Sequence, residues 1–132
     1  MNRIAFRRQR SGVTTVEFAF TIPVLFLFVF AAFELGRANM MMHTAEAAAY
    51  EGARTGIIPG AQADECITAA RQILGTCGIG QAGVEVTPNS LDTISENVAV
   101  EVSVSFKDNT ILAPLFMGDS VIERTCSMTR ER

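Results

Sequence analysis

The chain has 132 residues, a formal net charge of -3 and no tryptophan, which is enough for one small domain beside a membrane segment. Residues 1–12 contain four arginines and no acid, so the chain without them would carry seven basic and fourteen acidic residues. Because nucleic-acid-binding proteins need a basic face, this balance argues against nucleic acid as a partner.

An apolar run lies close to the N-terminus. From Phe18 to Phe33 no residue is charged, and six of the nine phenylalanines of the chain lie there. A helix from Val13 to Phe33 would be roughly 30 Å long at ~1.5 Å per residue, about one hydrocarbon thickness. We therefore expect a transmembrane helix over residues 13–34, in contact with the lipid bilayer.

Basic residues flank this run only on its N-terminal side, and Glu34 closes the other end. The basic residues are Arg3, Arg7, Arg8 and Arg10. Positively charged flanks stay in the cytoplasm, so the N-terminus is expected there and everything after Glu34 outside.

Three interpretations fit the N-terminal segment. The first is a simple membrane anchor. The second, a secretory signal peptide, needs a small-x-small site soon after the run, but Ala45-Glu46-Ala47 lies far downstream. The third is a prepilin-type signal, in which a basic leader and a glycine precede the cut and a glutamate is fifth after it. Gly12-Val13-Thr14-Thr15-Val16-Glu17-Phe18 has this spacing and predicts removal of residues 1–12.

The acid within the apolar run needs an explanation. A carboxylate at the edge of the hydrocarbon costs ~3 kcal/mol on insertion scales, which favours a partner. Cleavage after Gly12 would free the amine of Val13, which can pair with Glu17 of a neighbouring subunit. Alternatively, Glu17 lies at headgroup depth and needs no partner.

The helical pattern continues over residues 35–56 and is ended by Gly56, Pro59 and Gly60. Mostly small residues recur there at spacings of three and four: Leu35, Ala38, Met42, Ala45, Ala49 and Gly52. Small residues let helices approach closely. This stripe fits packing against the chain's own outer domain, against another subunit, or against both.

Residues 57–132 are expected to form a small α+β domain. Residues 64–74 have helical spacing, and short strands are predicted at 84–87, 97–106 and 121–129. The central strand alternates strictly, with five apolar residues on one face: Val98, Val100, Val102, Val104 and Phe106. We expect a roughly three-stranded antiparallel sheet packed on the 64–74 helix and on the outer part of the long helix.

Three cysteines, Cys66, Cys77 and Cys126, lie in this outer domain, where oxidation is permitted. The pairs Cys66–Cys126 and Cys66–Cys77 both fit the sequence, and so do three free thiols.

The single histidine, His43, is interpreted as a surface residue of the long helix, distant from every cysteine. We therefore expect no metal site and no cofactor. The outer domain has no histidine to act as a base and no serine in an elbow motif, so we expect no enzyme.

Three blocks of sequence resemble one family. They are Gly12 with Thr15-Val16-Glu17-Phe18-Ala19 and Pro23, then Phe33-Glu34-Leu35-Gly36-Arg37, then Ala48-Ala49-Tyr50-Glu51-Gly52-Ala53-Arg54. The chain is similar here to the TadE-like family, minor pseudopilins of the tight-adherence (Tad) pilus system, over about residues 8–58. Tyr50 stands where the family signature commonly has arginine.

The resemblance implies an accessory subunit for assembly of a Tad (Flp-type) pilus, processed by a prepilin peptidase. Its other partners would be pilin or pseudopilin subunits and the Tad assembly machinery, in the cell membrane or in the pilus. The alternative function is an uncleaved single-pass membrane protein that displays a small extracytoplasmic binding domain.

Overall fold

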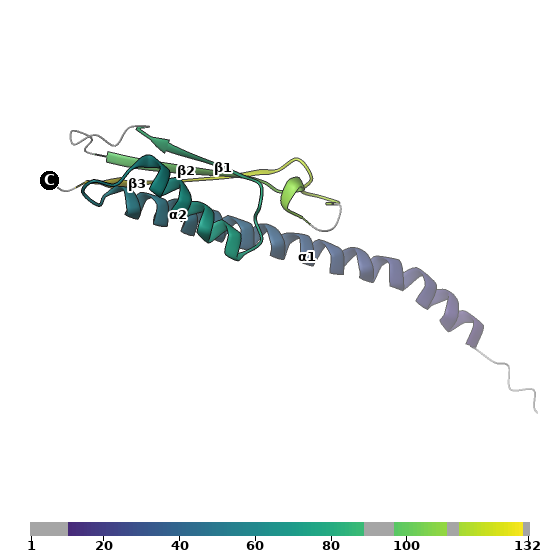
Figure 1. Cartoon of the computed structure of the whole chain (residues 1–132). Helices are drawn as coiled ribbons and strands as arrows, with labels where there is room; N and C mark the ends of the chain where they lie inside the picture. Colours follow the sequence, from purple (N-terminus) through teal and green to yellow (C-terminus); the bar gives the residue numbers. More distant parts are fainter. Residues whose placement is uncertain (1–10, 89–96, 111–113, 131–132) are drawn as a thin grey trace, which may run out of the picture. The chain divides into compact units, whose positions relative to one another are not determined.

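The computed structural model describes residues 11–88, 97–110 and 114–130 of the chain. The chain divides into two compact units, Met1–Phe33 and Glu34–Arg132. Its elements are α1 (Ser11–Gly56), α2 (Ala63–Thr76), β1 (Ala82–Thr87), β2 (Asn97–Ser105), the 3-10 turn η1 (Lys107–Asn109) and β3 (Val121–Thr129) (Figure 1). A long apolar N-terminal helix, one further helix and an antiparallel sheet confirm the predicted α+β fold.

The part of α1 in the first unit is apolar and exposed. Its 18-residue apolar window has a mean hydropathy of 2.3, and none of that window is buried. Twelve of its large apolar side chains are exposed, namely Val13, Val16, Phe18, Phe20, Val24, Leu25, Phe26, Leu27, Phe28, Val29, Phe30 and Phe33. Pro23 lies inside the helix without ending it. Soluble proteins rarely leave so large an apolar surface in water, so this segment is a candidate membrane span.

In the second unit, the sheet has the order β1–β2–β3, and both pairs of strands are antiparallel. Val102 of β2 lies opposite Val84 on one side, and Val100 lies opposite Cys126 on the other. Because successive side chains of a strand point to opposite faces, the alternating valines of β2 all point the same way. These valines and Phe106 are fully buried, which confirms the predicted inward face.

The outer part of α1 covers this valine face with small residues. The buried apolar residues of α1 are Ala38, Met41, Ala45, Ala48, Ala49 and Ala53, and they share one core with α2 and the sheet. A methyl group at Gly52 would lie 3.1 Å from the Cys66 carbonyl oxygen and 3.1 Å from Val100 Cγ1. Small side chains therefore let α1 approach α2 and β2 at the same place.

The predicted packing stripe is only partly buried. Ala38, Ala45, Ala49 and Gly52 are buried, Met42 is half-buried, and Leu35 is 67% exposed. The fully buried methionine is Met41, which was not in the stripe. The buried face includes Met41 and Ala48 and leaves Leu35 exposed, so it is turned about the helix axis relative to the predicted stripe.

The second helix is capped at both ends. The Glu65 carboxylate accepts the backbone N–H of Gln62 at 3.3 Å, which satisfies a donor at the N-terminus. At the C-terminus Gly78 adopts a φ of 68°, and the N–H of Ile79 reaches back to the Leu74 carbonyl at 3.1 Å. This is a Schellman ending, and the side chains of Ile79 and Leu74 are both buried beside it.

Two glycines between the predicted helix 64–74 and the predicted strand 84–87 belong to regular elements. Gly75 is within α2 and Gly83 is within β1. The helix ends at the left-handed Gly78 rather than at the first glycine. Gly83 lies opposite Ser103, whose side chain occupies the place that a Cβ at Gly83 would take.

The closeness of α1 to the sheet predicts a stability difference between two glycines. A Cβ at Gly56 would lie 2.7 Å from Val98 Cγ1 and 3.0 Å from Cys66 Sγ, both in the core. Gly56→Ala should therefore lower the free energy of unfolding by ~1–3 kcal/mol through overpacking. Urea unfolding of the full chain in detergent measures this.

Gly36→Ala is the matched control in the same helix. No atom lies within 4 Å of a Cβ placed at Gly36, and alanine favours a helix over glycine. This variant should be more stable by ~0.5–1 kcal/mol. Equal stability of Gly56→Ala and the unmodified chain would contradict the close packing described for α1.

Candidate functional site

The predicted processing residues lie in the first two turns of α1. Gly12, Val13, Glu17 and Phe18 are all exposed, and no atom lies within 4 Å of a Cβ placed at Gly12. A glycine inside a helix costs ~1 kcal/mol relative to alanine. Neither space nor a left-handed backbone requires glycine at position 12, so the described fold offers no reason for this residue.

Glu17 is an isolated acid on the apolar part of α1. Its backbone carbonyl accepts a hydrogen bond from the Thr21 hydroxyl at 2.8 Å. Among the residues that the structure describes, its carboxylate forms no hydrogen bond or ion pair. A carboxylate in this position is available to a partner outside the chain. The predicted orientation residues, Arg3, Arg7, Arg8 and Arg10, lie outside the described residues.

A second candidate site begins where the apolar run ends. The half-buried Glu34 accepts three backbone N–H groups from a loop that lies 81 to 83 residues later in the chain. Its carboxylate oxygens are 3.1 Å from the nitrogen of Leu115, 2.9 Å from that of Phe116 and 2.6 Å from that of Met117. Three donors converge on one charged group, and hydrogen bonds to a charged group are stronger than those between neutral groups. Glu34 therefore fixes the backbone of the 115–117 loop to α1.

One turn later, Arg37 binds two other connections of the same domain. Its Nη1 donates to the carbonyl of Cys77 at 3.3 Å, and its Nη2 donates to the carbonyl of Asn109 at 3.0 Å. The planar guanidinium suits this task because its donors point in several fixed directions. Arg37 thus joins α1 to the end of α2 and to η1.

Asn109 completes the arrangement from the side of the sheet. Its buried side-chain amide donates to the carbonyls of Gln81 at 2.6 Å and Ser105 at 3.0 Å, and its Oδ1 accepts the N–H of Gln81 at 3.0 Å. We call Glu34, Arg37 and Asn109 the polar clasp. It holds α1, β1, η1 and the 115–117 loop together.

The sequence reasoning missed the polar clasp as a unit. The sequence marks Glu34 as the end of the apolar run and, together with Arg37, as part of a family block, and Asn109 is not among the predicted site residues. A signal was nevertheless present, because an acid and a base directly after a long uncharged run must find polar surroundings. Asn109 lies 72 residues after its partner Arg37, and Leu115 lies 81 residues after its partner Glu34. No local sequence pattern predicts hydrogen bonds between residues so far apart in the chain.

All three cysteines are free thiols in the structure. Cys66 lies in the first turn of α2 and Cys77 caps its other end, so the helix separates them by roughly 16 Å at ~1.5 Å per residue. A disulfide needs Cα atoms within about 7 Å of each other, and the Cys66–Cys77 pair therefore does not fit this fold.

The environments of two of these thiols differ. Burial raises the pKa of the Cys66 thiol. Hydrogen bonds from the hydroxyls of Thr44 and Thr76, with the nearby Arg37 charge, lower the pKa of the Cys77 thiol. Cys77 is thus the thiol with more thiolate at a given pH, and Cys66 is chemically protected.

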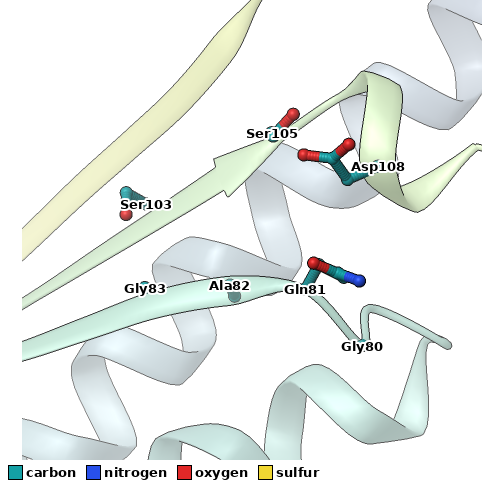
Figure 2. A pocket seen from close by; sticks show the side chains of 7 residues that line it. All are labelled: Gly80, Gln81, Ala82, Gly83, Ser103, Ser105 and Asp108. Atoms are coloured by element: carbon teal, nitrogen blue, oxygen red, sulfur yellow. The ribbon is translucent and has the colours of Figure 1, made fainter.

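An open polar hollow of about 410 Å³ lies between the start of β1 and the end of β2. Figure 2 shows the hydroxyls of Ser103 and Ser105, the amide of Gln81 and the carboxylate of Asp108 around it, and Gly80, Ala82 and Gly83 also line it. Among the described residues that line it, there is no histidine, cysteine or lysine side chain that could form a nucleophile–base pair with either serine.

His43 is an exposed residue of α1, with its Nδ1 3.8 Å from the carboxylate of exposed Glu46. Within residues 11–88, 97–110 and 114–130, no three of the side chains His, Cys, Asp and Glu group as metal ligands. The expectation that the chain holds no metal stays a prediction.

Arg37 gives a direct test of the polar clasp. In Arg37→Lys the single amine cannot reach the Cys77 and Asn109 carbonyls together, so one buried acceptor loses its charged donor. We expect a loss of ~1–3 kcal/mol in the free energy of unfolding, measured by urea titration of the full chain in detergent.

Arg54→Lys serves as the control on the same helix. Arg54 is exposed, and its partner among the described residues is Glu51, at 3.4 Å. Its replacement should change stability by less than ~0.5 kcal/mol. Similar effects for the two lysine variants would show that the Arg37 contacts contribute nothing specific.

Comparison with known proteins identifies one family. Residues 12–54 match a family model described as TadE-like protein, which is 43 of the 132 residues. No curated protein and no solved structure matches the chain. The matched stretch starts at Gly12 and includes Glu17, Glu34 and Arg37. Over residues 12–54, the chain therefore matches the TadE-like family that its sequence motifs predicted.

Proposed function

We propose that this protein is a TadE-like pseudopilin, a membrane-anchored structural or accessory subunit for assembly of a Tad (Flp-type) pilus. The observation that supports this most directly is the first part of α1. It is an apolar helix with no buried residue in its apolar window, and at its start it carries a glycine that the described fold does not require and an acid without a partner among the described residues. The family match begins at that glycine.

The proposal assigns a role to each part of the chain. Residues 1–12 are a basic leader that is removed, and residues 13–34 span the bilayer. Residues 35–56 continue the helix outside, and residues 57–132 form the extracytoplasmic domain with them. The arginines of the leader keep the N-terminus in the cytoplasm during insertion.

The role is structural rather than enzymatic. Among the described residues that line the polar hollow, neither serine has a histidine or lysine beside it, and the polar clasp binds backbone atoms of the chain itself. Groups saturated in this way stabilise a fold and are unavailable for acid–base chemistry.

The first partner is a prepilin peptidase that cuts after Gly12. The peptidase must bring its catalytic groups close to the backbone, and a residue without a side chain permits that approach. Because the described fold does not require glycine at this position, recognition by a peptidase is a sufficient reason for it.

The further partners are pilin or pseudopilin subunits and the Tad assembly machinery. After cleavage, the amine of Val13 is a positive charge within the apolar surface, and Glu17 is a negative charge on the same helix face one turn later. In a stack of helices, the amine of one subunit can neutralise Glu17 of its neighbour and set the register between them.

A single-pass protein with an uncleaved leader and a binding domain is the second candidate. The open hollow lined by Gln81, Ser103 and Asp108 favours it, because it offers polar groups to a small ligand. The mass of the protein from its native membrane separates the two proposals. An N-terminus at Val13 supports the pseudopilin, and an intact Met1 supports the alternative.

The proposed cut predicts a processing defect. Gly12→Leu should leave a full-length precursor in the membrane, because a branched side chain keeps the peptidase from the backbone. Mass spectrometry of the membrane fraction measures the ratio of precursor to mature chain. Gly36→Leu is the control, since Gly36 is also a helical glycine with no atom within 4 Å of a Cβ. Mature protein of normal size from Gly12→Leu would place the cut elsewhere.

The proposed pair predicts a defect that appears only after cleavage. Glu17→Ala and Glu17→Gln should insert and be processed normally, because Gly12 and the arginines remain. Both should impair pilus assembly, since removing one partner of a buried ion pair costs ~3–5 kcal/mol, or about a thousandfold in association. Pili counted by electron microscopy provide the measurement, with Glu46→Ala as the exposed-acid control. Normal piliation in both Glu17 variants would refute the pairing.

A further inference from the structure

Two large apolar side chains of the second unit lie together on its surface. Leu115 and Phe116 are consecutive residues, and each is 62% exposed. Met117, the next residue, packs against the core. A pair of adjacent exposed apolar residues beside a half-buried one is unusual for a loop in water, where apolar surface is removed from solvent when a partner is available.

The loop that carries them is held in place. Its three consecutive N–H groups all bind the Glu34 carboxylate, so the backbone donors are satisfied without water. Pro114 precedes these residues, and its ring lies 3.5 Å from the position of a Cβ at Gly118. The backbone of the loop is therefore fixed in a conformation that leaves the Leu115 and Phe116 side chains exposed.

The position of Glu34, which binds the loop, indicates what covers Leu115 and Phe116. Glu34 is the residue directly after Phe33, the last residue of the uncharged run. A helix that spans the bilayer up to Phe33 has Glu34 at the boundary between hydrocarbon and headgroups. Leu35, the next residue, is also 67% exposed and adds apolar surface at the same level of the helix.

We propose that the loop of residues 114–117 is a second membrane contact, in which Leu115 and Phe116 enter the lipid interface. This rests on the proposed membrane anchoring of α1. Aromatic and leucine side chains favour the boundary between acyl chains and headgroups. Glu34 tolerates that boundary because three N–H groups solvate its charge.

A lipid surface explains the arrangement better than a second protein copy does. The lipid boundary is present wherever α1 leaves the hydrocarbon, whereas a protein partner would need a complementary surface at that depth. Asp119 is exposed two residues after Met117 and can stay among headgroups and water. Two attachment points, the helix and the loop, then limit how freely the outer domain reorients at the membrane.

The chain lacks tryptophan, so a single introduced tryptophan reports its own surroundings. The full chain carrying Phe116→Trp is reconstituted into vesicles of phosphatidylethanolamine and phosphatidylglycerol, part of which have brominated acyl chains. We expect a blue-shifted emission and strong quenching by the brominated lipid, with weak quenching by aqueous acrylamide. Phe116 is exposed, so the larger ring replaces it without disturbing the core.

Two further single-tryptophan variants separate the possible failures. Phe30→Trp lies within the apolar run and should be quenched by brominated lipid if the run spans the membrane. Tyr50→Trp replaces another exposed aromatic of the second unit and should be quenched by acrylamide instead. If Phe30→Trp escapes the brominated lipid, both the anchoring and the loop proposal fail. If Phe30→Trp is quenched and Phe116→Trp reports water, only the loop proposal fails.

A tryptophan at position 116 that is shielded from both quenchers would show a protein partner, and this result would also overturn the lipid contact. The role of Glu34 is tested by adding Glu34→Gln to Phe116→Trp, which removes the charge that gathers the three N–H groups. Quenching by brominated lipid should then decrease and that by acrylamide should increase. Unchanged quenching, with unchanged circular dichroism, would overturn the part of the proposal in which Glu34 holds the loop.

Discussion

The close packing of small α1 residues on the valine face of β2 is the contact on which the second unit depends. The sheet has only three strands, and its other face carries polar and acidic residues, with Glu85 directly opposite Glu101. Such a sheet cannot bury its valines without a cover. The alanines of α1 let the helix backbone come close enough that a methyl group at Gly52 or Gly56 would press on Val100 or Val98. Because these side chains are small, the helix packs close to the sheet, and the core between them is dense.

The two parts of α1 therefore differ in the environment of their side chains. Up to Phe33 its large apolar side chains are exposed, whereas from Ala38 its small ones are buried in the core of the second unit. Leucine and phenylalanine suit a solvent of acyl chains, and alanine suits a tightly packed helix–sheet contact. The change from one composition to the other occurs within about one turn, and the charged residues Glu34 and Arg37 lie in that turn.

The polar clasp explains why those two charged residues lie in this turn. Glu34 accepts three backbone N–H groups, and Arg37 donates to two backbone carbonyls as well as to the Sδ of Met40 at 3.8 Å. Backbone groups at the ends of elements need partners when they leave water, and a charged partner on a rigid helix supplies them at a fixed place. Asn109 does the same from the sheet side. This makes the beginning of the second unit a defined structure, and the same hydrogen bonds hold the backbone of the 115–117 loop while Leu115 and Phe116 stay exposed.

The sequence by itself determined the elements, the fold class, the apolar run and the family of residues 12–54, because periodicity, end signals and short motifs are local properties of the chain. It placed the valines of β2 on one face for the same reason. Only the tertiary structure decided that Met41 rather than Met42 is buried, that α2 keeps Cys66 and Cys77 apart, and that Glu34, Arg37 and Asn109 form one clasp. These features depend on the rotation of a helix against its partner and on hydrogen bonds between residues more than 70 positions apart. No local pattern encodes them, since a charged group binds whichever backbone atoms the finished fold brings within reach.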